Sequence, residues 1–121
     1  MERNRQFDER YLMFGAAILK LLPQLPRNKV GAHLSDQLFR SGTSVGAHFE
    51  ESRGAESKAD FIHKLGMALK EARETYYWLR LIEKGEVLSL GQISELLREA
   101  NEIVAMLTAS VKTAKEKHVR S

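Results

Sequence analysis

The sequence predicts an all-α protein, an antiparallel four-helix bundle with up-down-up-down topology. Apolar residues recur every three or four positions through most of the chain, and no stretch alternates with the period of two that a half-buried strand needs. Proline and glycine residues divide this pattern into four segments with short connections, so consecutive helices should pack antiparallel. The 121 residues are the length of one ordinary domain, and we expect a single bundle over residues 1–121.

The first helix is expected over about residues 8–22 and the second over about 28–54. Pro23 and Pro26 separate them, because proline lacks the backbone N–H that the helical ladder needs. Apolar side chains follow a helical stripe on both sides of this break. The two segments therefore read as two helices joined by a short turn.

The second helix is unusually rich in small residues, among them Gly31, Gly42 and Gly46. A glycine inside a helix costs about 1 kcal/mol relative to alanine. Three of them in one helix therefore need a reason. We expect a neighbouring backbone to approach the helix closely at these positions.

The third and fourth helices are expected over about residues 58–84 and 90–117. Ser57 and Ser89 each precede, by three residues, an acid or amide that completes the spacing of a capping box. Gly85 follows the third helix as a C-terminal stop. These signals set both ends of the connection between the two helices.

The third helix is apolar on more than one face, which indicates burial on more than one face. In a bundle this small, a contact between subunits is the natural second place of burial. A wide core stripe would explain the same pattern. The residues expected at an oligomer interface are Met67, Tyr77, Trp78 and Leu81.

Composition excludes several classes of protein. The chain has no cysteine, so it has no disulfide, no thiolate metal site and no cysteine nucleophile. No segment has the roughly 18 consecutive apolar residues of a membrane span, and no secretory signal is visible, so we expect a cytoplasmic protein. The net charge of +3 permits a nucleic-acid partner without requiring one.

No motif predicts an enzyme, a metal site or a cofactor. A di-iron bundle would need two Glu-x-x-His motifs, whereas the chain has one related pair, Asp60 and His63. There is no glycine-flanked nucleophile on a strand-to-helix turn and no phosphate-binding loop with a lysine. We therefore expect a non-catalytic protein without cofactors.

Arg40 lies beside the core stripe of the second helix. If the second and third helices fold back around residues 55–56, Arg40 comes level with Glu71 and one turn from Glu74. An interhelical ion pair is then expected, and such a pair more often fixes register than adds stability. The alternative is that Arg40 binds a phosphate.

Cations gather near both ends of the chain, which an up-down-up-down bundle brings to the same end. Such a cluster would bind phosphates without reading base sequence. The alternative is that these cations favour the helix dipole and solubility. No aromatic residue lies among them, so base stacking is not indicated there. The residues concerned are Arg3, Arg5, Arg10, Lys112, Lys115, Lys117 and Arg120.

Two stretches resemble one known family. Residues 37–51, QLFRSGTSVGAHFEE, and residues 57–75, SKADFIHKLGMALKEARET, are similar to the two conserved blocks of the four helix bundle protein family, also called 23S rRNA intervening-sequence protein. His48 stands where that family usually has asparagine. The resemblance implies an antiparallel bundle that assembles into a homopentamer. A more distant similarity is to the accessory variability protein of diversity-generating retroelements, a basic pentamer that works with nucleic acid.

These expectations give two hypotheses of function. The first is a non-catalytic homo-oligomer, pentameric by the resemblance, that binds RNA or DNA through clustered Lys and Arg. The second is an oligomeric scaffold for a protein partner, with no binding of nucleic acid. Salt dependence separates them, because phosphate contacts weaken as salt rises.

Overall fold

The protein is all-α, as the computed structural model of the chain shows, and its four long helices confirm the predicted bundle. The structure describes the backbone of residues 2–120 and the side chains of residues 6–119. The elements are α1 (Glu2–Leu21), a short 3-10 turn η1 (Leu22–Gln24), α2 (Lys29–Arg53), α3 (Lys58–Lys84) and α4 (Leu90–Arg120).

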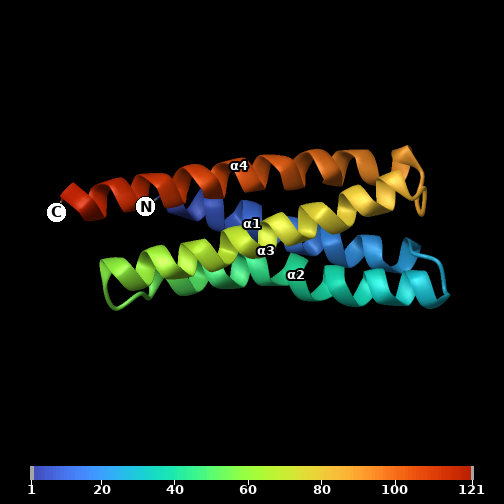
Figure 1. Cartoon of the computed structure of the whole chain (residues 1–121), viewed down its shortest axis with the longest axis horizontal. Coiled ribbons are helices and arrows are strands. Elements are labelled where there is room, and N and C mark those ends of the chain that lie inside the picture. The colour runs from blue at the N-terminus through green and yellow to red at the C-terminus, as the bar shows by residue number, and fades with distance from the viewer. Residues whose placement is uncertain (1, 121) are drawn as a thin grey trace.

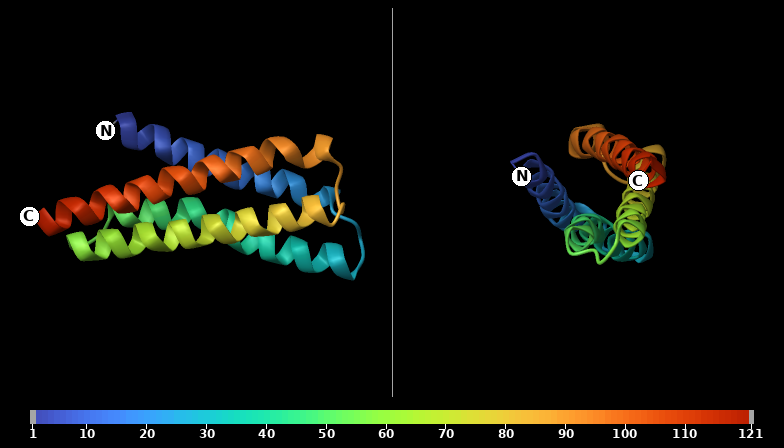
Figure 2. Two further views of the ribbon diagram at one scale, coloured as in Figure 1. Left: turned by 45° about the horizontal axis from the view of Figure 1, so that its top comes forward. Right: turned by 90° about the vertical axis from the view of Figure 1, so that its left-hand side faces the viewer.

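The four helices run along one long axis, with the start of α1 and the end of α4 at the same end (Figure 1). Seen end-on, they follow an open arc in the order α1, α2, α3, α4, so α1 lies opposite α3 (Figure 2). Helix α1 packs mainly on α2, and its contact with α4 is much smaller. The α1–α4 side is therefore the open side of the bundle.

The largest fully buried side chains come from all four helices, so one core fills the bundle. They recur at the three- and four-residue spacing that predicted the helices. The core includes Tyr11, Phe14, Ile18, Leu38, Val45, Leu65, Leu79, Ile82, Ile93, Ile103 and Leu107.

Two outer helix boundaries differ from the sequence prediction. Helix α1 begins at Glu2 rather than near residue 8, and α4 continues to Arg120 rather than residue 117. Residues 2–7 contain no proline or glycine, and Phe7 extends the α1 stripe against the core, so nothing stops the helix earlier. The left-handed backbone after α3 falls on Glu86, with φ 55°, and not on Gly85.

The predicted caps form where the serines stand. The Asp60 N–H donates to Ser57 Oγ at 3.0 Å, and the Ser89 N–H donates to Gln92 Oε1 at 2.9 Å. Asn28 caps α2 by accepting the Gly31 N–H at 2.9 Å. Each bond satisfies a donor at a helix start that would otherwise lack a partner.

The three glycines of α2 have different surroundings. A Cβ on Gly31 would lie 1.7 Å from the carbonyl oxygen of Pro26, which is the close backbone approach that we expected. At Gly42 the neighbour is a side chain, because a Cβ would lie 2.8 Å from two carbons of Ile18. At Gly46 the nearest atoms, of Tyr11, are 3.5 Å away, an ordinary contact. Gly46 therefore does not need to be glycine for steric reasons.

A buried polar contact joins α2 to α3 at mid-height. The hydroxyls of Ser41 and Thr75, both fully buried, lie 2.8 Å apart, and the Thr75 hydroxyl is also 2.8 Å from the Glu71 carbonyl oxygen. A buried hydroxyl without a partner costs about 1–3 kcal/mol. A shift of α3 along or around its axis would break this contact, so the pair fixes the register of the two helices.

Replacing Gly42 with alanine should destabilise the protein, because the new methyl group meets Ile18. Gly66→Ala is the matched control, since a Cβ there has no heavy atom within 4 Å. Both changes gain the same helix propensity, about 1 kcal/mol, so their difference isolates a steric cost of roughly 1–3 kcal/mol. Urea unfolding at one protein concentration measures it. Equal stabilisation by both changes would show that α1 does not approach α2 at Gly42.

Candidate functional site

Arg40 binds two carboxylates of α3. Its guanidinium donates to Glu71 Oε1 at 3.3 Å and pairs with Glu74, so the two acids are those that the register predicts. The Trp78 Nε1–H donates to the same Glu74 carboxylate at 3.1 Å. The Arg40 charge is therefore engaged on the α2–α3 side of the bundle, where it supports register.

Arg10 is also engaged, although we expected it among the phosphate-binding cations. Its Nε–H and terminal N–H donate to the two Glu99 oxygens at 2.9 and 2.7 Å, and a third bond of 3.0 Å reaches Glu102. These hydrogen bonds raise the pKa of Arg10 and lower the pKa of Glu99. Arg10 thus links α1 to α4, and two acids neutralise its charge.

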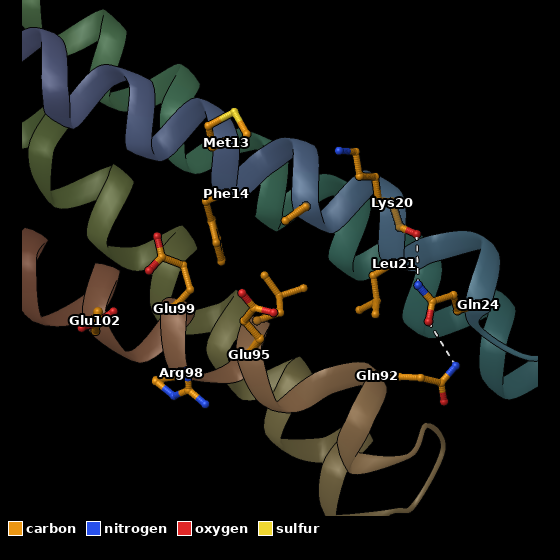
Figure 3. Close-up of a pocket in the computed structure, with 12 residues that line it drawn as sticks. Met13, Phe14, Lys20, Leu21, Gln24, Gln92, Glu95, Arg98, Glu99 and Glu102 are labelled. Atoms are coloured by element: carbon orange, nitrogen blue, oxygen red, sulfur yellow. Dashed lines mark hydrogen bonds between the residues drawn. The ribbon is translucent and has the colours of Figure 1, made fainter.

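A cleft of about 470 Å³ lies between the later part of α1 and the early part of α4 (Figure 3). Phe14 and Leu21 point toward it from α1, and Glu95 and Glu99 from α4, whereas Arg98 points away. Arg10 binds Glu99 and Glu102, and Lys20 and Arg98 also line the cleft, so charges of both signs are present. The cleft therefore lacks the excess of cations that attracts phosphates.

The described chain offers no grouping of metal ligands. Among the described residues, no three His, Asp or Glu side chains come together. Asp60 serves the start of α3, where it accepts the Glu56 N–H at 3.2 Å and pairs with Lys64 at 3.7 Å. Across the helices of residues 2–120, no segment combines the length and apolar character of a membrane span.

The predicted cluster of terminal cations is spread over different faces. Lys115 lines a shallow depression with Lys70 on the α3 side, whereas Lys117 lines a different one with Phe7 and Arg53 on the α1 side. Two residues of separation turn a helix by about 200°, so Lys115 and Lys117 cannot share a face. Lys112 is exposed one turn before Lys115. The side chains of Arg3, Arg5 and Arg120 lie outside the described residues.

A second group of cations, not expected from the sequence, forms a continuous stripe along the outside of α3. Lys70, Arg73, Arg80 and Lys84 are all exposed, and Lys115 of α4 joins them beside Lys70. We call these five residues the basic face. Within the described chain, none of the five has an ion-pair partner, in contrast to Arg10 and Arg40.

The sequence does carry a signal for this stripe. Cations and one aromatic residue, Tyr77, follow each other at steps of three, four, three and four from residue 70 to residue 84. That spacing places all of them on one side of a helix, and Glu74 borders the stripe one turn from Lys70 and Tyr77. The acids Glu71 and Glu74 fall on the neighbouring side, where Arg40 binds them.

The residues expected at an oligomer interface differ in how exposed they are on α3. Trp78 is half-buried, with its ring edge-on to His33 of α2 at 5.7 Å between centroids. Tyr77 and Leu81 are exposed by 57% and 42% on the outside of the helix. Met67 is half-buried. The Tyr77 and Trp78 rings contact each other, with centroids 5.2 Å apart, and Leu81 lies one turn from both.

Exposed apolar surface also occurs on α1. Residues 11–19 contain no charged side chain, and Leu12 and Leu19, which line the groove between α1 and α2, are 64% and 46% exposed. Beside them, Phe39 of α2 is 55% exposed. Small residues of both helices line the groove between, including Ala16 and Ala47. We call this surface the apolar face; the nine-residue uncharged run was its signal in the sequence.

The comparisons with known proteins agree with this architecture. The family model described as 23S rRNA-intervening sequence protein matches residues 7–109. The chain is similar to a crystal structure from Bacteroides thetaiotaomicron, a protein with unknown function from the S23 ribosomal protein family. The two are 38% identical with a TM-score of 0.80, over 87% of this chain and 97% of that one. No curated protein matches.

The ion pair across the open side predicts a pH effect. Because Arg10 lowers the folded pKa of Glu99, the ionised carboxylate stabilises the fold. This contribution is complete above the unfolded glutamate pKa, about 4.3, and is lost as pH falls through the lower folded pKa. The stability difference between wild type and Arg10→Gln should therefore shrink below about pH 4.3, as measured by urea unfolding.

Arg98→Gln is the control for this experiment, because Arg98 is an exposed arginine that points away from the cleft. It should change stability little at any pH. A wild-type advantage over Arg10→Gln that stays constant down to about pH 3 would contradict the Arg10–Glu99 account.

Proposed function

Because this chain belongs to the 23S rRNA-intervening sequence protein family, we propose that it is a non-catalytic, self-associating bundle that binds nucleic acid. Phosphates bind along the basic face of α3 and α4. Copies of the chain meet through the apolar face of α1 and α2. In the end view α1 lies opposite α3, so the two surfaces do not compete (Figure 2).

The observation that carries the proposal is that the five exposed cations of the basic face are aligned along one side of the bundle and have no acid partner in the part of the chain that the structure describes. Arg10, Arg40 and Arg53 each bind acids from another helix, whereas the basic face has no acid partner within the described residues. Exposed cations that lack partners can neutralise phosphates and release counterions, which is the main source of affinity for nucleic acid. The face is also linear, as a polynucleotide backbone is.

The proposal contains no catalytic step. Several hydroxyl groups of α2 and α4 form hydrogen bonds to the backbone of their own helix. Thr43, Ser44 and Thr108 each donate to the carbonyl oxygen one turn earlier, at 2.6, 2.6 and 2.7 Å. Ser52 does the same in the core, with a bond of 2.6 Å to the Phe49 carbonyl. These contacts are structural, and none of them activates a nucleophile.

Self-association is supported by the apolar face. A soluble monomer seldom exposes a contiguous apolar patch of this kind, and such patches commonly mark contacts between proteins. The family resemblance favours five copies. An assembly would repeat the basic face once per copy, which raises affinity for a long polynucleotide through multivalency.

The role of the basic face is tested by replacing its three lysines with glutamine. Lys70→Gln/Lys84→Gln/Lys115→Gln should weaken the binding of a short single-stranded RNA and lower the salt slope of log K by about 2. The physical reason is the loss of three phosphate contacts. Fluorescence anisotropy from low to moderate salt measures both quantities.

The matched control removes three exposed lysines from other surfaces, Lys20→Gln/Lys29→Gln/Lys117→Gln, with the same change in net charge. It should leave the slope nearly unchanged. Equal losses in both variants would mean that net charge alone acts. No binding at low salt would exclude the nucleic-acid function and leave the protein-scaffold alternative.

The apolar face is tested by a charge placed within it. Leu12→Asp/Leu19→Asp should reduce the mass of the particle in light scattering, because two carboxylates would be desolvated in the contact. Leu90→Asp is the control, since Leu90 is 64% exposed at the start of α4. A wild-type protein that is monomeric at the working concentration would contradict self-association.

A further inference from the structure

We propose that Tyr77 is a base-stacking site, so that the basic face binds single-stranded nucleic acid in preference to duplex. This inference rests on the proposed function and adds the class of ligand. The cations supply affinity for the backbone of any strand. Tyr77 adds a contact that only an unpaired base can make.

The position of Tyr77 within the stripe is the first observation. Arg73 precedes it by four residues and Arg80 follows it by three, all on the outside of α3. At 1.5 Å per residue, the cations lie about 6 Å and about 4.5 Å from Tyr77 along the helix axis. A base stacked on Tyr77 would therefore have a guanidinium near the phosphate on either side.

The exposure of the ring is the second observation. Tyr77 is 57% exposed. The Trp78 ring meets it nearly edge-on, with centroids 5.2 Å apart and planes at 72°. One part of the Tyr77 ring is thus supported, and the remainder stays open to solvent among cations.

The support behind Tyr77 is tied to α2 by side-chain contacts. Trp78 is held by the 3.1 Å hydrogen bond to Glu74, and Glu74 is in turn bound to Arg40 of α2. The His33 ring packs on Trp78 from α2, with planes at 82°. A stacking platform held in place loses little entropy when a base binds. The same Arg40 network that fixes the helix register therefore positions the candidate site.

The preference for a single strand follows from the chemistry of the platform. In a duplex the base faces are already stacked on one another, and only phosphates, sugars and base edges are accessible. An unpaired strand can turn a base onto an aromatic ring, and this contact is tolerant of base identity. We therefore infer little sequence preference.

The experiment compares two strands of equal charge. One is a short oligoadenylate, and the other is an abasic strand of the same length, which keeps the phosphates but has no base to stack. Wild type should bind the oligoadenylate about tenfold more tightly than the abasic strand. Tyr77→Leu should remove that difference, and Tyr77→Phe should keep it.

The protein provides its own reporter and control. Trp78 is the single tryptophan and contacts Tyr77, so its fluorescence should change with oligoadenylate and not with the abasic strand. Phe61→Leu removes an exposed aromatic residue outside both the basic face and the apolar face, and it should leave both affinities unchanged. Circular dichroism confirms that each variant is folded.

The outcomes separate the two proposals. If oligoadenylate, abasic strand and duplex bind equally and Tyr77→Leu has no effect, the stacking site is wrong while phosphate binding by the basic face stands. Tighter binding of duplex than of single strand would also overturn the stacking site. If no strand binds at low salt, both proposals fail.

Discussion

The packing of α2 against α3 is the constraint on which the rest of the structure depends. Ser41 and Thr75 share a buried hydrogen bond, and Arg40 binds Glu71 and Glu74 beside it. Together these contacts fix both the height and the rotation of α3. Since a helix has 3.6 residues per turn, holding one side of α3 against α2 determines which residues face outward. The basic face is a consequence of this register.

Charge is distributed according to the same packing. Several acids are bound by arginines from a neighbouring helix, as Arg10 binds Glu99 across the open side and Arg40 binds Glu71 and Glu74. Other exposed cations have no ion-pair partner within the described residues, and five of them form the basic face. The net charge of +3 therefore understates the local charge of that face.

The repeat of apolar residues was sufficient to predict the four helices, and the fold-back arithmetic was sufficient to predict the partners of Arg40. The site was harder to predict, because a cation in a sequence does not reveal whether a carboxylate from another helix will bind it. Arg10 shows this, since Glu99 is far from it in sequence. The rotation of each helix about its own axis also determines which side chains face outward. This rotation places Lys115 and Lys117 on different faces of α4, and it exposes Tyr77 on the outside of α3.

The most direct test of the account is to locate bound RNA on the protein. Wild-type protein is crosslinked at low salt to a short oligouridylate that carries a photoreactive 4-thiouridine, and the modified peptides are identified by mass spectrometry. The account predicts adducts on α3 between Lys70 and Lys84, with Tyr77 among the modified residues, and on α4 near Lys115. Adducts confined to α1 and α2, or to the cleft between α1 and α4, would contradict it.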